Sequence, residues 1–460
     1  MASRGSHEMT ALERLGQHVA SGAPVPDARE LVELHLIDTV GAWIASAPTA
    51  EGRLLLRFRA ETRETEGDGS LALDLATRCA LARLSEIDDI HLASMTTPGA
   101  LVIPGALTLA AATPEAKADD LIAAILAGYE AMTRLGRAID GPTVLYRGIW
   151  PTYFAAPFGL AAVAARLLRL DAQAAANALA LALTLAAPGV GHHNAQTTAR
   201  WLAVGNAARN GLAAALAAKA GFTSDLKLIE GNFLSGVYGV TPDGAALTSG
   251  LGDSPALAQV SFKPWCAARQ TMAATQALRE IIETGVEPAT MTGIKAVVLP
   301  PHLKMVGHGV TAGDRASHLT SLPYCMAVAA MAPDLAFDVA ASPASLPPAL
   351  RAFMDKITVE ADERLLADYP RAWAARVSVE AASGRHERLL AHIPGDPARP
   401  FDRSQVREKF LRFARPVVGT AKAEQLLARC SASFAHGQFA ALVGEIEQVC
   451  EETFTRHFGR

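Results

Sequence analysis

The residues most able to do chemistry lie in one stretch, from Glu86 to Pro104, which reads Glu-Ile-Asp-Asp-Ile-His-Leu-Ala-Ser-Met-Thr-Thr-Pro-Gly-Ala-Leu-Val-Ile-Pro. Glu86, Asp88, Asp89 and His91 fall within six positions of a chain that is otherwise rich in Ala and Leu. On a helix, Asp88 and His91 would face the same way, because side chains three positions apart share a face. Buried acids are costly unless they are paired or used. The stretch therefore indicates either a proton-transfer site or an N-cap cluster on a solvated loop, and its residues alone leave both open.

Thr-Thr-Pro-Gly at 96–99 breaks the helical pattern, because Pro cannot continue a helix and Gly releases the backbone. A second, apolar helix is expected at about 102–112. We predict that an acidic helix end brings Asp88, Asp89 and His91 to the lining of a cleft between two domains. A like charge beside such an acid would raise its pKa and a nearby cation would lower it, so the direction stays open at this point.

Composition narrows the class of protein. The 460 residues allow two or more domains and a large core. A hydrophobic content of 50% with 19% charged residues indicates a globular chain, and a net charge of -4 gives no reason to expect nucleic acid as a partner. The five cysteines are scattered without a Cys-x-x-Cys pair, which fits a reducing cytoplasm and argues against a structural zinc.

Targeting and cofactor signals are also weak. The N-terminal residues lack the apolar core of a signal peptide, so we expect a cytoplasmic protein. The Ala-rich runs at 155–168 and 174–188 are divided by charged residues into pieces shorter than the roughly 20 apolar residues of a membrane span. No Gly-x-Gly-x-x-Gly follows a strand and no phosphate loop is present, so no cofactor is expected. His192-His193 could bind a metal, but adjacent histidines without a carboxylate at helical spacing are weak evidence, and we expect no metal.

The hydrophobic pattern changes twice along the chain. Helical spacing predicts helices in 8–47, 71–84, 117–140, 154–168, 172–187 and 202–220, and again from Ser404 to the end. Between these regions the pattern is mixed, with helices at 269–284 and 315–331, the second kinked at Pro323, and strands at 293–299, 356–359 and 375–381. We predict a mainly α protein with a large discontinuous all-helical domain, residues 1–262 and 402–460, and a smaller α+β domain, residues 263–401.

The block Asp-Asp-Ile-His…Thr-Pro-Gly-Ala-Leu-Val-Ile-Pro-Gly-Ala-Leu resembles the signature of the MmgE/PrpD family, which includes 2-methylcitrate dehydratase, cis-aconitate decarboxylase and iminodisuccinate epimerase. Other segments resemble the family in the same order: Asp38–Gly41, Gly205–Gly211, Gly221–Thr223, Phe262–Trp265 with Arg269, Ser321–Tyr324, Gly395–Pro397 and Arg407–Phe410. The resemblance implies a helical domain made from both chain ends, a smaller α+β domain between them, an active site at their interface, a small polycarboxylate substrate and a homodimer.

The chain departs from the family pattern at four histidines. Thr97-Pro98-Gly99 stands where the family usually has His-Pro-Gly, and Gly148-Ile149-Trp150 where it has Gly-Phe-His. Arg200-Trp201-Leu202-Ala203 replaces Lys-x-Leu-His, and Arg269-Gln270-Thr271-Met272 replaces Arg-x-x-His. Arg200 keeps the positive charge of the lysine but not its ability to lose a proton.

The family resemblance implies chemistry that begins when a proton or a carboxylate leaves a carbon next to a carbonyl or carboxylate. Such a step needs a base near neutrality and cations that hold the substrate. The candidates for catalysis are His91, Asp88, Asp89, Lys263, Tyr324 and Tyr146, and those for substrate binding are Arg200, Arg269, Glu86 and Thr97.

Three functions are open on the sequence alone. The first is a dehydratase or decarboxylase, a lyase acting on a small di- or tricarboxylate. The second is an epimerase of the iminodisuccinate type, which the missing histidines favour because epimerisation needs no acid for a leaving group. The third is a catalytically inactive paralogue that serves as a binding subunit.

Overall fold

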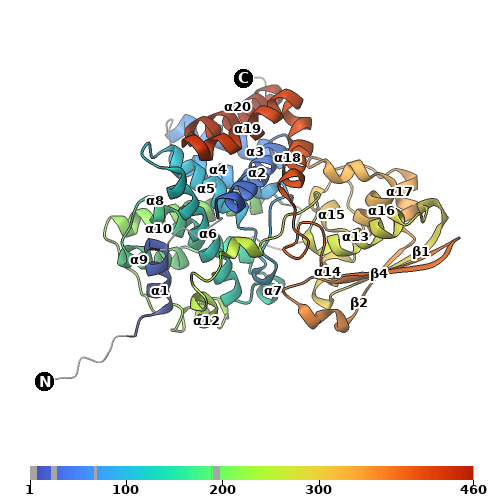
Figure 1. Ribbon diagram of the computed structural model, residues 1–460, viewed down its shortest axis with the longest axis horizontal. Helices are drawn as coiled ribbons and strands as arrows, with labels where there is room; N and C mark the ends of the chain where they lie inside the picture. Colours follow the sequence, from blue (N-terminus) through green and yellow to red (C-terminus); the bar gives the residue numbers. More distant parts are fainter. Residues whose placement is uncertain (1–7, 22–27, 67–69, 188, 190–196, 459–460) are drawn as a thin grey trace.

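The computed structural model describes residues 8–21, 28–66, 70–187, 189 and 197–458, and it consists of two bodies that lie side by side (Figure 1). One body is helical and the other carries a sheet with helices packed on it. The prediction of a mainly α protein with a smaller α+β part is confirmed. Among the described residues, no strand precedes residue 291.

The helical body is built from both ends of the chain. Its first part contains α1 (Ala11–Ser21), α2 (Ala28–Ser46), α3 (Ala50–Glu66), α4 (Leu71–Leu84), α5 (Gly99–Ala111), α6 (Ala118–Ala138), α7 (Gly141–Val144), α8 (Pro151–Leu167), α9 (Ala172–Thr184), α10 (Ala199–Lys219), α11 (Phe233–Tyr238) and α12 (Gly244–Thr248). The C-terminal helices α18 (Arg403–Val418), α19 (Thr420–His436) and α20 (Phe439–Phe458) return to lie against α2 and α3 (Figure 1). Local signals fix several helix starts: the side chain of Ser70 accepts a hydrogen bond from the N–H of Leu73, which caps α4.

The two largest hydrophobic cores among the described residues follow this division, and two smaller clusters join the two bodies. The larger core joins side chains between Ala11 and Phe262 to side chains between Val406 and Cys450. The second core contains side chains between Trp265 and Ile393. The domain limits inferred from the sequence, 1–262 with 402–460 and 263–401, remain an inference, which this separation of the cores supports.

The sheet has the strand order β2-β1-β3-β4. Strand β1 (Met291–Val298) pairs in parallel with β2 (Ile357–Ala361) and antiparallel with β3 (Ala375–Ala381), and β3 forms a hairpin with β4 (Gly384–Leu390). Helix α13 (Arg269–Glu283) packs against β3 and β4, and the remaining helices of this body are α14 (Pro300–Val306), α15 (Arg315–Thr320), α16 (Leu322–Met331) and α17 (Pro348–Met354).

Two local predictions need correction, and one strand was missed. The helix predicted at 315–331 is two helices, because Ser321 is an N-cap and Pro323 occupies the first turn of α16, where its missing N–H costs nothing. Strand β4 was not predicted, because it is mostly exposed and its sequence is charged. The acidic stretch is not a helix end, since α4 stops at Leu84 and the chain after it runs in irregular, extended form.

Candidate functional site

The acidic segment, defined here as residues 85–91, is held in place through its main chain. Ile90 and Ser261 exchange two backbone hydrogen bonds of 2.9 and 2.8 Å, and the N–H of His91 donates to the carbonyl of Thr96 at 2.8 Å. From the C-terminal part of the chain, Lys409 donates to the carbonyl of Ile87 at 2.8 Å. These contacts come from distant parts of the sequence, so tertiary structure and not helix propensity sets the path of the segment.

The side chain of Asp89 links the acidic segment to three helices, and both of its carboxylate oxygens have partners there. One of its oxygens accepts the N–H of Gly99, at the start of α5, at 2.8 Å. The other accepts the hydroxyl of Tyr129 at 2.6 Å and contacts Nδ1 of His35 at 2.8 Å. The side chain is buried, with no exposed surface. Asp89 therefore acts as a structural anchor that positions α5 and the preceding Thr97.

Asp88 and Glu86 share two cations. Nζ of Lys263 lies 3.2 Å from a carboxylate oxygen of each residue. Arg83, in the last turn of α4, lies 3.0 Å from Glu86 and 3.3 Å from Asp88. The second oxygen of Asp88 is buried without a hydrogen-bond partner among the described residues. Burial raises the pKa of Asp88, although Arg83 and Lys263 act in the opposite direction.

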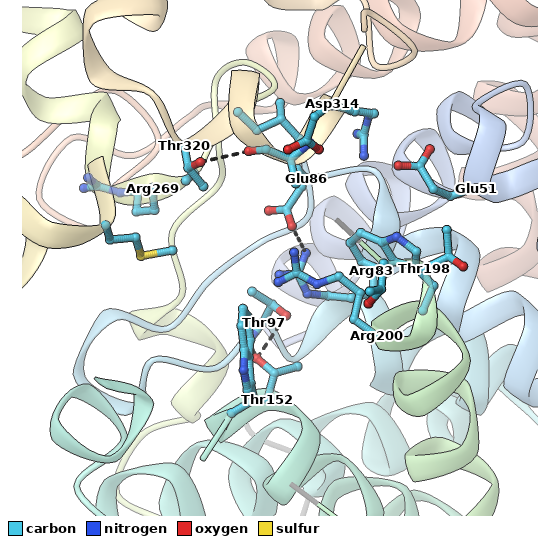
Figure 2. Close-up of a pocket in the computed structure, with 18 of the residues that line it drawn as sticks. Glu51, Arg83, Glu86, Thr97, Thr152, Thr198, Arg200, Arg269, Asp314 and Thr320 are labelled. Atoms are coloured by element: carbon cyan, nitrogen blue, oxygen red, sulfur yellow. Dashed lines mark hydrogen bonds and ion pairs between the residues drawn. The ribbon is translucent and has the colours of Figure 1, made fainter. Parts of the chain in front are cut away.

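Glu86 points its carboxylate into a cluster of cations (Figure 2). Burial alone would raise the pKa of Glu86, but Arg83, Lys263, Arg200 and Arg315 outweigh it and lower this pKa to about 2. Its backbone is in the left-handed region, with φ of 57°, which costs a non-glycine residue on the order of 1 kcal/mol. Glu86 is therefore an anion at neutral pH and a poor base.

A cavity of about 400 Å³ opens on this cluster, between the helical body and the α+β body. Among the ten candidates from the sequence, those that line it are Glu86, Thr97, Arg200, Lys263 and Arg269. Thr97 contacts Thr152 at one wall, with 3.3 Å between the hydroxyl oxygens (Figure 2). Arg269 is buried and paired with Asp396 at 2.7 Å, but its Nε and Nη1 have no hydrogen-bond partner among the described residues.

The other five candidates do not line this cavity, and the prediction that His91, Asp88 and Asp89 do so is wrong. Asp88 and Asp89 lie behind its wall, because the extended segment turns them into the protein. His91 is bonded to Ser94 and faces a separate polar cavity of about 200 Å³, and burial lowers its pKa to about 4. A buried imidazole that resists protonation there is a structural group and not a proton carrier of the main cavity.

The two tyrosines are placed elsewhere. Tyr324 lines a small pocket of the α+β body with Cys266 and Cys325, and burial raises its pKa to about 12. Tyr146 is partly exposed on a short turn outside the main cavity, and burial of its hydroxyl raises its pKa above the usual range. Neither hydroxyl is among the groups that line the main cavity.

Sequence reasoning missed two arginines of the site. Arg83 precedes the acidic stretch by three positions at the end of a helix, a spacing that places it beside Glu86. Arg315 begins α15, more than 200 residues away, and donates to the carbonyl of Ser85 at 3.1 Å and to that of Val339 at 2.6 Å. The spacing could have revealed Arg83, whereas nothing local in the sequence points to Arg315.

Within the described ranges, no group of three or more His, Cys, Asp or Glu side chains could hold a metal ion. The His192-His193 pair lies outside the described residues. No described helix is both long enough and apolar enough to span a bilayer.

The fold and the site together define a class of protein, in which a helical body and a smaller α+β body enclose a cavity that five cations line among the described residues. Residues 17–248 match the model of the MmgE/PrpD N-terminal domain, and residues 265–433 match that of the MmgE/PrpD C-terminal domain. The chain belongs to the MmgE/PrpD family, whose members are generally enzymes of the dehydratase or lyase type. A comparison with curated proteins gave no match.

Proposed function

We propose that this chain is a lyase that acts on a small di- or tricarboxylate, by dehydration or decarboxylation next to a carboxylate, in the cavity between its two domains. One observation carries the proposal. Five cations line the cavity, and two of them, Arg200 and Arg315, form no ion pair with a carboxylate among the described residues. Unpaired, partly desolvated guanidinium groups are the groups that bind carboxylates and stabilise negative charge that develops on them.

Lys263 is the proposed proton carrier. It is buried, it lines the cavity, and its contacts with Glu86 and Asp88 hold the ammonium in one place. In dehydration, a water molecule in the cavity would take the proton from the carbon next to the carboxylate, and the electron pair of that C–H bond would form the double bond. Nζ would give a proton to the departing hydroxyl, which leaves as water. In decarboxylation, CO₂ would leave, and Nζ would give its proton to the carbon that retains the electron pair. In both reactions the lysine regains a proton from solvent.

An epimerase is the second candidate. Thr97 and Trp150 line the cavity at positions where the family resemblance leads one to expect histidines. Thr and Trp cannot serve as acids for a leaving group near neutral pH, and an epimerase needs no such acid. An inactive, carboxylate-binding paralogue is the third candidate, which the same cations would serve equally well.

Proton NMR in deuterated water separates the three. The purified protein is incubated with di- and tricarboxylates of four to seven carbons. A lyase yields an alkene or a product shorter by one carbon, and an epimerase replaces the proton next to the carboxylate and inverts that centre without loss of a group. Saturable binding without any exchange supports the inactive paralogue and contradicts both enzyme proposals.

A further inference from the structure

The cations of the cavity differ in how much of their charge is already compensated. Arg83 and Lys263 each contact carboxylates of the acidic segment, and Arg269 is paired with Asp396. Each of these three cations forms an ion pair with a carboxylate of the protein, although Nε of Arg83 and both Nε and Nη1 of Arg269 have no hydrogen-bond partner among the described residues. A ligand carboxylate would therefore compete with a carboxylate of the protein for their charge. They hold the site together more than they offer free charge.

Arg200 and Arg315 remain to bind a ligand. Arg315 uses Nε and Nη2 on main-chain carbonyls, which leaves Nη1 without a hydrogen-bond partner among the described residues. Nε of Arg200 is likewise unpartnered among them. The other carboxylates of the wall, Glu51 and Asp314, form no ion pair with either arginine, and Asp314 caps the N–H of Ala316 at 3.1 Å. Two cations of the cavity that form no ion pair with a described carboxylate match two substrate carboxylates better than three.

Arg200 is held by two aromatic rings. Its guanidinium carbon lies 4.5 Å from the ring centre of Trp150 and 5.1 Å from that of Trp201. Trp150 is supported on Tyr153, with ring centres 5.7 Å apart and nearly parallel planes. Contact with the indoles restricts the guanidinium plane and leaves its N–H edge for in-plane hydrogen bonds, the geometry of a bidentate carboxylate contact.

Part of the cavity wall is apolar. Ile90 and Met95 are buried beside it, next to Leu145, and Met305 and Leu319 contribute from the α+β body. These side chains offer no hydrogen bond to a third carboxylate, and a carboxylate placed against them would lose its hydration without compensation. Transfer of an alkyl group from water to this wall would lower the free energy of binding.

We propose that the substrate is a dicarboxylate with an apolar substituent, one carboxylate of which binds edge-on to Arg200 between Trp150 and Trp201. This inference rests on the proposed function and narrows its substrate class. Arg200 is the residue that determines specificity, because a lysine at this position could not present two parallel N–H donors. The apolar wall receives the substituent, so affinity depends on the length of that substituent.

Isothermal titration calorimetry with four probes tests this inference: succinate, 2-methylsuccinate, 2-propylsuccinate and tricarballylate. Each added carbon should tighten binding by about two- to fourfold, so 2-propylsuccinate, with three more carbons, should bind about 8- to 64-fold tighter than succinate. Tricarballylate should bind no tighter than succinate. Arg200→Lys should weaken 2-propylsuccinate binding by at least about tenfold. Arg137→Lys is the matched control, because Arg137 is exposed on the separate cavity near His91 and should bind as wild type does.

The outcomes separate the inference from the proposed function. Equal affinity along the alkyl series, or tighter binding of tricarballylate, overturns the apolar dicarboxylate class. Loss of water or CO₂ from any polycarboxylate in deuterated water still keeps the proposed lyase. Wild-type affinity in Arg200→Lys overturns the role of the clamped arginine. If no probe binds and no polycarboxylate reacts, both the inference and the proposed function fail.

Discussion

Glu86→Gln would remove the charge of a carboxylate held among four cations while keeping its size and its place in the chain. Because the side chain is largely buried and its pKa is lowered from 4.5 to about 2, its ionised form stabilises the folded state. A shift of that size corresponds to about 3 kcal/mol of folding free energy, at 1.36 kcal/mol for each pKa unit. We therefore expect Glu86→Gln to be less stable than wild type by up to about 3 kcal/mol at pH 7.

The pH dependence follows from the direction of that shift. The folded pKa lies below the unfolded one, so the contribution of Glu86 is complete above about pH 4.5 and disappears as the pH falls toward 2. The stability gap between the variant and wild type should stay constant from pH 7 to about 5 and then narrow. Urea unfolding followed by circular dichroism at pH 7, 5 and 3 measures it.

Glu51→Gln is the matched control, because Glu51 lines the same cavity and forms no ion pair among the described residues. Its effect on the urea midpoint should be close to zero at each pH. A Glu86→Gln gap that is absent at pH 7, or one that does not narrow in acid, would refute the view that the cations hold this carboxylate ionised.

Three further predictions concern the structure around the site. Because burial lowers the pKa of His91 to about 4, wild type should lose up to about 3 kcal/mol of stability from this group as the pH falls from 6.5 to 4. In urea titrations, His91→Asn should remove that part of the acid dependence. An unchanged dependence of stability on pH in the variant contradicts this prediction. Asp89→Asn should cost about 2–4 kcal/mol in the same assay, because Asp89 accepts three buried contacts, and a cost under about 0.5 kcal/mol would show that it is no anchor. We expect a homodimer, in which the exposed side chains of Leu202, Leu216 and Phe222, on and just after α10, would be buried at the interface. A monomeric mass by light scattering at micromolar concentration contradicts this prediction.

The fold could be predicted from the sequence where the hydrophobic periodicity is strong. Helix α4 and strand β3 lie at the predicted residues, and the change of pattern near Lys263 coincides with the change from one hydrophobic core to the other. The sequence of strand β4 shows no alternation of apolar and polar residues, because β4 is a charged strand at the edge of the sheet. Only its pairing with β3 identifies it as a strand.

The site was accessible only in part. The family resemblance indicated Lys263 and Arg269, which do line the cavity. Local reasoning failed for His91, because it assumed a helix where contacts with Ser261 and Thr96 impose an extended chain, and extension changes which way each side chain points. Arg315 could not be predicted as a site residue, since only the packing of the two bodies brings it to the acidic segment.

The central claim is that Lys263 delivers a proton to a carbon or an oxygen next to a carboxylate held in this cavity. Lys263→Arg is the sharpest test, because arginine keeps the positive charge between Glu86 and Asp88 but does not give up its proton. The measurement is the rate of product formation or deuterium uptake by NMR, with a polycarboxylate that wild type converts and that calorimetry shows the variant still binds. We predict that Lys263→Arg lowers this rate by at least about 100-fold with little change in Kd. A wild-type rate in Lys263→Arg would contradict the account.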